Sequence, residues 1–160
     1  QGDTLSMLQT VLITLHNISR WLVLVFGILA AARAFSGWRG KKAWTPADDR
    51  AGMLFTSLLD LQLLFGLVLY FTSPFMLPIL QNFGAAMSNS FQRFFAVEHA
   101  FAMLLAVVAA HVGRALSKKA STDAAKHKRA AIGFTVALVL ILAAIPWSRP
   151  LLQFFGLFTL

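Results

Sequence analysis

The chain contains no cysteine among its 160 residues. Disulfide frameworks, thiolate-bound metals, iron–sulfur clusters and covalently attached c-type heme are therefore excluded. Any metal bound by this protein must rest on histidine, methionine or carboxylate ligands. The sequence also has no glycine-rich phosphate loop, no nucleophile elbow and no HExxH motif. These absences argue against a hydrolase or a nucleotide-dependent enzyme.

Charge is scarce and unevenly placed. Charged residues make up 12% of the chain and hydrophobic residues 58%, whereas about a quarter of an ordinary soluble domain is charged. The net charge of +8 would suit a nucleic-acid binder, but eleven of the fourteen Lys and Arg lie in two stretches, 33–50 and 114–129. Both stretches separate long apolar runs, as the positive-inside rule expects of cytoplasmic loops. The pattern indicates a protein of the lipid bilayer with no nucleic-acid partner.

Four apolar runs are long enough to cross a hydrocarbon core of about 30 Å as helices. They cover roughly residues 8–35, 51–72, 91–116 and 130–145. The beginning of the chain lacks a basic n-region and a small-residue cleavage pattern, so we expect the first run to be a retained span. Helix starts are predicted at Thr45-Pro46 and at Ser121-Thr122, and Pro146 is expected to end the last helix.

An even number of spans with both basic loops on one side predicts an all-α fold. We expect a single transmembrane domain, an integral membrane antiparallel four-helix bundle with both termini outside (N-out/C-out). Segment 73–90 carries two prolines and no charge, and we expect it to lie along the outer interface. Segment 147–160 is predicted to be an apolar interfacial tail.

Ionisable groups within a span are costly, so each is a candidate functional residue. Counting 1.5 Å per residue from the basic inner end of each span places His16 about 26 Å, Arg20 about 20 Å, Glu98 about 24 Å and His99 about 22 Å from the inner edge. The first and third spans therefore each present an imidazole at a similar depth. Two such imidazoles match the axial ligands of a six-coordinate heme b inside an apolar bundle.

In this hypothesis His16 and His99 ligate the iron, Arg20 and Arg93 neutralise propionates, and Glu98 fixes an imidazole tautomer. The alternative is structural: Arg20 and Glu98 form a buried ion pair that locks the first span to the third, and the histidines bond to that pair or to carbonyls. A chlorophyll ligated by one of these histidines is equally compatible with the residues.

Three further polar residues have open roles. His111 lies about 5 Å from the inner edge and could ligate a second heme only with His127 as partner, so one heme is expected rather than two. The KHKR cluster around His127 is expected to contact phospholipid headgroups. Asp60 lies about 15 Å deep, near Gln62. It is interpreted either as a proton carrier to a quinone site or as a hydrogen-bond donor to a neighbouring helix.

Four sequence motifs carry a resemblance: LHNISRW, DLQLLFGLVLYFTSP, RFFAVEH and KHKR. Together they resemble a family of small four-helix bacterial integral membrane proteins that are described as cytochrome b-like, over about residues 16–146. The resemblance implies ligand roles for His16 and His99, and also for His111. Where some relatives are expected to have a histidine in the second span, this chain has Asp60, which argues against an inner heme held by the second and third spans.

The sequence thus predicts a membrane b-type cytochrome of the bacterial inner membrane. It would transfer electrons with a quinone or within a larger respiratory or photosynthetic complex, as an electron-transfer protein rather than a stand-alone enzyme. One alternative is a cofactor-free accessory subunit that docks onto a larger membrane complex through segments 73–90 and 147–160. Another is a small transporter or proton path through Arg20, Glu98 and Asp60. Assembly as a homo-oligomer is compatible with each of them.

Overall fold

The computed structural model describes residues 2–147, with side chains from Ser6 onward. All regular structure in this range is helical. The described chain contains four helical stretches that are long and apolar enough to cross a membrane: Ser6–Arg39, Pro46–Thr72, Ser90–Lys118 and Asp123–Ala144. The predicted all-α class and number of candidate spans are confirmed. The predicted tail lies outside the described residues apart from Trp147.

The long helices are α1 (Gly2–Arg39), α2 (Pro46–Thr72), α6 (His99–Lys118) and α7 (Asp123–Ala144). Two of them begin at the predicted caps. The Asp48 carboxylate accepts hydrogen bonds from the backbone N–H of Thr45 at 2.9 Å and from its hydroxyl at 2.6 Å. The hydroxyl of Thr122 accepts from Ala125 N–H at 3.3 Å. Both helices begin earlier than their apolar runs, because capped polar first turns can extend beyond the hydrocarbon.

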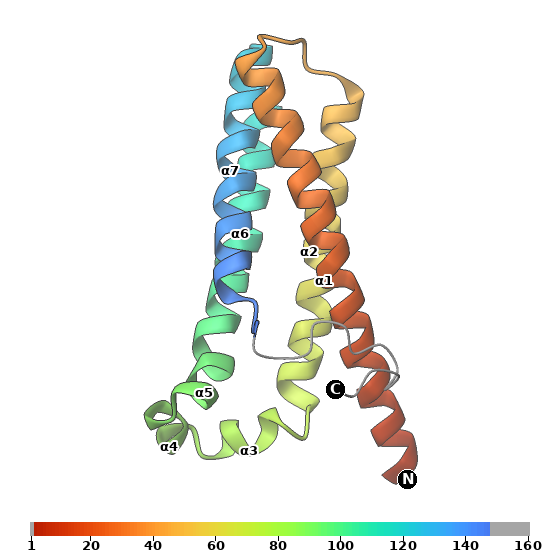
Figure 1. Ribbon diagram of the computed structural model, residues 1–160, viewed down its shortest axis with the longest axis vertical. Helices are drawn as coiled ribbons and strands as arrows, with labels where there is room; N and C mark the ends of the chain where they lie inside the picture. The colour runs from red at the N-terminus through yellow and green to blue at the C-terminus, as the bar shows by residue number, and fades with distance from the viewer. Residues whose placement is uncertain (1, 148–160) are drawn as a thin grey trace.

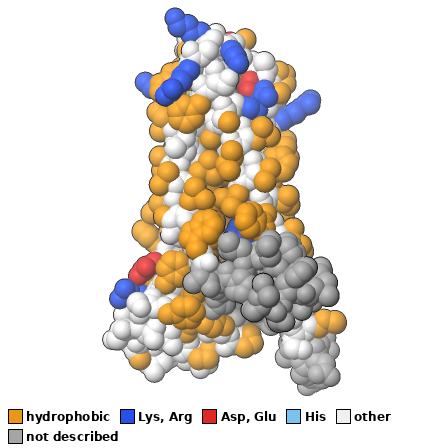
Figure 2. Space-filling model, viewed as in Figure 1, with side chains coloured by type: hydrophobic (Ala, Val, Ile, Leu, Met, Phe, Trp, Pro, Cys, Tyr) orange, Lys and Arg blue, Asp and Glu red, His pale blue; other side chains and the backbone are white. Residues whose placement is uncertain are grey.

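The four long helices form a bundle in which neighbours along the chain run in opposite directions (Figure 1). Helix α1 packs against α2 and α7, and α6 packs against the same two helices. Helices α1 and α6 therefore occupy opposite corners. The turns after α1 and α6 share one end, where Lys and Arg side chains gather (Figure 2). We call it the basic end.

Large apolar side chains cover the outside of the bundle between its two ends (Figure 2). Val25 is 59% exposed, Ile28 58% and Val108 56%. Continuous apolar surface of this kind is unfavourable in water but suits hydrocarbon. The surface fits a multi-pass protein in a lipid environment.

Small residues allow the helices to approach closely in the interior. A Cβ atom added to Gly133 of α7 would lie 2.4 Å from the Cα of Gly113 in α6, so these two backbones touch. Phe55 and Phe134 fill the centre of the bundle edge to face, with ring centroids 5.5 Å apart. The other fully buried residues near them are mostly alanines: Ala106, Ala110, Ala130, Ala131 and Ala137.

Residues 73–93 join α2 to α6 at the end opposite the basic end (Figure 1). They form the short helices α3 (Met76–Gln81), α4 (Phe83–Ser88) and α5 (Ser90–Arg93). Their buried residues Met76, Ile79 and Ala86 pack in a small cluster with Ala96, which belongs to the following helical turn, Phe94–Glu98. This segment, predicted at the outer interface, thus closes one end of the bundle over the start of the third candidate span.

The contact between Gly113 and Gly133 generates a stability prediction. Gly133→Ala places a Cβ against helix backbone rather than against a flexible side chain, so α6 and α7 must separate. We expect a loss of about 1–3 kcal/mol, measured as a lower midpoint of thermal unfolding in detergent. Gly84→Ala is the matched control, because nothing lies within 4 Å of its Cβ position. Equal midpoints for the two variants would contradict the close contact.

Candidate functional site

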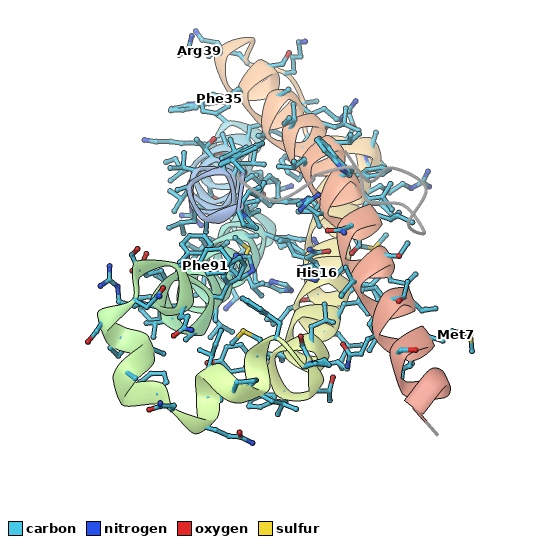
Figure 3. All side chains as sticks on the ribbon, turned by 60° about the horizontal axis from the view of Figure 1, so that its bottom comes forward. Met7, His16, Phe35, Arg39 and Phe91 are labelled. Atoms are coloured by element: carbon cyan, nitrogen blue, oxygen red, sulfur yellow. The ribbon has the colours of Figure 1, made fainter. Side chains whose placement is uncertain are left out.

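His16 lies on α1 where this helix faces α2 (Figure 3). Its Nε2 is 3.2 Å from the side-chain amide nitrogen of Gln62. Its Nδ1 is buried and has no hydrogen-bond partner among the described residues. A Cβ at Gly66 would lie 3.3 Å from the ring, so a glycine at this position lets the imidazole lie close to α2. One ring nitrogen is thus held by a neighbouring helix, and the other is available.

Gln62 is held in turn by Ser19, one turn after His16. The Ser19 hydroxyl donates to the Leu15 carbonyl at 2.7 Å and also contacts the Gln62 amide oxygen. Sequence reasoning noted Gln62 only as a neighbour of Asp60. The signal that would have found it is its polarity within an apolar run, since a buried amide requires partners on another helix.

His99 is the first residue of α6, and a carbonyl at the end of α7 orients it. Its Nδ1 is 2.7 Å from the oxygen of Ala144. That carbonyl is available because the last four carbonyls of a helix have no partner within the helix. A carbonyl only accepts, so Nδ1 carries the proton and Nε2 of the neutral ring carries the lone pair. The rings of Phe94 and Phe95 lie 6.0 and 6.3 Å from the imidazole, centroid to centroid.

Glu98 does not take either role predicted for it. Its carboxylate accepts from Nε of Arg93 at 2.8 Å, and both side chains are about half exposed, at 51% and 45%. The expected pair with Arg20 is thus replaced by a pair with Arg93, and Ala144 rather than Glu98 fixes the His99 tautomer. The reason is a π-helical turn over Phe94–Glu98. Its extra residue rotates Glu98 around the helix axis, away from the direction that a regular α-helix would give it.

Arg20 is 8% exposed, and its guanidinium lies over the ring of Trp21 at 5.7 Å from the ring centroid. Arg20 lies one turn after His16 on α1, and His99 begins α6 at the opposite corner of the bundle. Arg93 instead pairs with Glu98 and donates to the Met87 carbonyl at 3.3 Å.

His111 belongs to a separate pair. Its Nε2 is 3.3 Å from the Asp60 carboxylate, and its Nδ1 is 3.0 Å from the Val107 carbonyl. The side chains of His111 and Asp60 are 44% and 55% exposed. This pair connects α6 to α2 on the outside of the bundle. His127, considered as the second partner of His111, lies instead against Trp44, with ring centroids 4.8 Å apart.

Protein side chains alone do not form a metal cluster among the side chains described from Ser6 to Trp147: no three His, Asp or Glu groups there are close enough to hold an ion. A heme differs because the porphyrin supplies four of the six iron ligands, so that two imidazoles complete the set. The group formed by His16, Arg20 and His99 has the residue types that such a cofactor requires.

The contact between Gln62 and His16 generates the second prediction. Gln62→Leu removes the partner of His16 Nε2 and leaves a buried ring with two unsatisfied nitrogens. We expect a loss of about 1–3 kcal/mol, measured by thermal unfolding in detergent. Gln9→Leu is the control, because half-buried Gln9 also bonds α1 to α2, through two exposed hydrogen bonds to Thr72. If Gln9→Leu lowers the stability of the protein as much as Gln62→Leu does, the contact between Gln62 and His16 contributes no more to stability than the contact of Gln9 with Thr72.

No protein-family model, curated protein or solved structure matches this chain. The resemblance of its four motifs to cytochrome b-like membrane proteins therefore remains a prediction, and the function has to be argued from the geometry of the described residues.

Proposed function

We propose that this protein is a membrane b-type cytochrome with one heme b between α1 and α6, ligated by His16 and His99. The observation that carries the proposal is that two helices at opposite corners of the bundle each present an imidazole, His16 and His99, and that a neighbouring helix holds one nitrogen of each ring. Bound there, the heme would supply one-electron chemistry. The protein residues hold the ligands, neutralise charge and exclude water.

His99 has the geometry of a metal ligand. In metal-binding histidines, one nitrogen donates to a carbonyl or carboxylate and the other faces the metal. The Ala144 carbonyl accepts a hydrogen bond from Nδ1–H of His99 and thereby fixes the ring orientation. Nε2 then presents its lone pair away from α7. This arrangement is independent of Glu98, which the sequence had suggested for the role.

Gln62 is the neighbour that positions His16. In the structure its amide nitrogen faces Nε2 of His16 and its amide oxygen faces Ser19. Heme ligation through Nδ1, the atom without a hydrogen-bond partner among the described residues, would require the two ends of this amide to exchange, so that Nε2–H donates to the amide oxygen and the lone pair resides on Nδ1. In the proposed cytochrome, Gln62 would thus be a positioning residue for His16.

Arg20 and the aromatic residues complete the environment. Arg20 is buried one turn after His16, and its positive charge would be complementary to the carboxylates of heme. Phe94 and Phe95 supply apolar walls beside His99. An apolar, water-poor surrounding of this kind stabilises the neutral imidazoles that ligate iron and tunes its potential.

The structural alternative loses its main element. It required an ion pair between Arg20 and Glu98 to lock the first span to the third, but Glu98 pairs with Arg93, five residues earlier in its own segment. A pair so close in sequence ties no two spans together. The ion-pair part of this alternative is therefore not found, whereas its other part, a histidine bonded to a carbonyl, matches the contact of His99 with Ala144.

A quinone is the electron partner that this structure favours. The Asp60–His111 pair lies on the outside of the bundle between α2 and α6, at about half exposure. Within a bilayer, that position is reached from the lipid, where quinones dissolve. A carboxylate hydrogen-bonded to an imidazole can accept a proton released by a quinol. In this proposal, Asp60 and His111 handle protons, while His16 and His99 hold the redox group.

The third prediction tests the cofactor. We expect the purified protein to show a reduced-minus-oxidised b-type heme spectrum, with one heme per chain by pyridine hemochrome. His16→Ala and His99→Ala should each abolish six-coordinate heme, because each removes an axial ligand. His111→Ala is the matched control and should retain the spectrum.

Circular dichroism separates ligand loss from misfolding, since a folded variant keeps its helical signal. Titration of the folded, heme-free protein with hemin provides a second test. Absence of heme in the natural protein and failure to bind hemin would overturn the proposal. A spectrum that survives in the His16 and His99 variants would exclude these two ligands.

A further inference from the structure

A pocket of about 480 Å³ opens near the basic end of the bundle, about 26 Å from the level of His16 along α1. It lies between the last turns of α1, the following loop and the first turns of α2 and α7. Its polar lining consists of Arg33, Ser36, Lys42, Thr45, Asp48 and His127. The volume falls within the range of small-ligand sites.

The positive charges of the pocket exceed the negative ones. Arg33 and Lys42 are cationic and Asp48 is the single acid in the lining. The Asp48 carboxylate is already occupied, because it accepts from Arg33 at 2.9 and 3.0 Å and from Thr45 at 2.6 and 2.9 Å. Lys42 donates only to the Ser36 hydroxyl, at 2.9 Å, and is exposed. An anion can therefore be held by Lys42 without competing with a free carboxylate.

The floor of the pocket contains a buried acceptor. His127 is 1% exposed, and its Nδ1 has no hydrogen-bond partner among the described residues. Its Nε2 lies 3.4 Å from the Ala43 carbonyl, so the proton belongs on Nε2 and the lone pair on Nδ1. A Cβ at Gly37 would lie 2.1 Å from the ring, so the glycine lets the backbone of α1 pack directly against this edge of the imidazole. A ligand would reach the buried Nδ1 from the pocket that His127 lines.

A ligand for this pocket therefore needs an anionic group and a hydrogen-bond donor. A phosphodiester linked to a polyol has both: the phosphate faces Lys42 and Arg33, and a hydroxyl donates to His127 Nδ1. Apolar side chains continue the site toward the middle of the bundle, because Ile28 and Leu29, one turn before Ala32 and Arg33, are 58% and 46% exposed. Acyl chains can lie along them.

We propose that this pocket binds the headgroup of an anionic glycerophospholipid such as phosphatidylglycerol. Lys42 and Arg33 bind the phosphate, and His127 accepts from a glycerol hydroxyl. This site would anchor the basic end of α1 to α7 through a lipid and does not depend on heme binding. Soluble glycerol phosphate shares the recognised chemistry, but it lacks the acyl chains that would pack on Ile28 and Leu29.

The fourth prediction tests the lipid site with the full chain in detergent. Dioleoyl-phosphatidylglycerol should raise the thermal unfolding midpoint at lower concentration than dioleoyl-phosphatidylcholine or soluble glycerol 1-phosphate. Lys42→Gln should weaken the phosphatidylglycerol response about fivefold, as expected for one lysine near a phosphate. Lys119→Gln, with the same charge change at the basic end but outside the pocket, should have little effect.

A second variant tests His127. His127→Phe keeps an aromatic ring beside Trp44 and removes the acceptor, so it should reduce the preference for phosphatidylglycerol over dioleoyl-phosphatidic acid, which lacks the glycerol hydroxyls. Equal effects of the Lys42 and Lys119 variants would show that phosphatidylglycerol responds to the overall positive charge of the basic end rather than to the pocket, and would overturn the proposal. An equally strong response to glycerol 1-phosphate would exclude a lipid as the ligand. An unchanged lipid preference in His127→Phe would remove His127 from recognition.

Discussion

Hydrocarbon offers no hydrogen bonds, and this constraint explains where polar side chains lie along the candidate spans. Hydroxyl groups satisfy it within their own helix: Thr14, Ser19 and Thr56 each donate to the carbonyl four residues earlier, at 2.7–3.1 Å. Imidazoles and amides have more hydrogen-bonding groups than one backbone carbonyl of their own helix can satisfy, so they also need partners on other helices. His16 meets Gln62, His99 meets the end of α7, and His111 meets Asp60. Polar contacts thus tie α1 to α2, α7 to α6 and α6 to α2.

The helices of the bundle do not pack equally closely. The glycine contact brings the backbones of α6 and α7 together. Helix α1 packs against α7 as well as α2, and it moves away from α7 between the basic end and the end that carries α3–α5 (Figure 1). His16 and His99 belong to α1 and α6, at opposite corners of the bundle. In the proposed cytochrome, ligands from opposite corners would hold a flat ring between two pairs of helices.

The sequence was sufficient to predict the long helices and the caps of α2 and α7, because these depend on hydropathy and local capping. The sequence did not predict the partner of Glu98. Counting residues along the third span assumes a regular α-helix, and the π-helical turn at Phe94–Glu98 breaks that assumption. Sequence reasoning also missed the contacts of Gln62 and the pairing of Asp60 with His111. Those depend on how α2 is rotated against α1 and α6, which no pattern within one helix determines.

The length of α1 decides which level of the bundle lies near each membrane surface. Its 38 residues span about 57 Å, nearly twice the hydrocarbon thickness of about 30 Å. In a bilayer, Arg33 and Arg39 would hold one end at the headgroups, since cationic side chains resist entry into hydrocarbon. His16, about 26 Å away, would then lie close to the opposite surface rather than at the midplane. In the proposed cytochrome, the heme would therefore lie nearer the face formed by α3–α5 than the Asp60–His111 pair, which lies nearer the basic end.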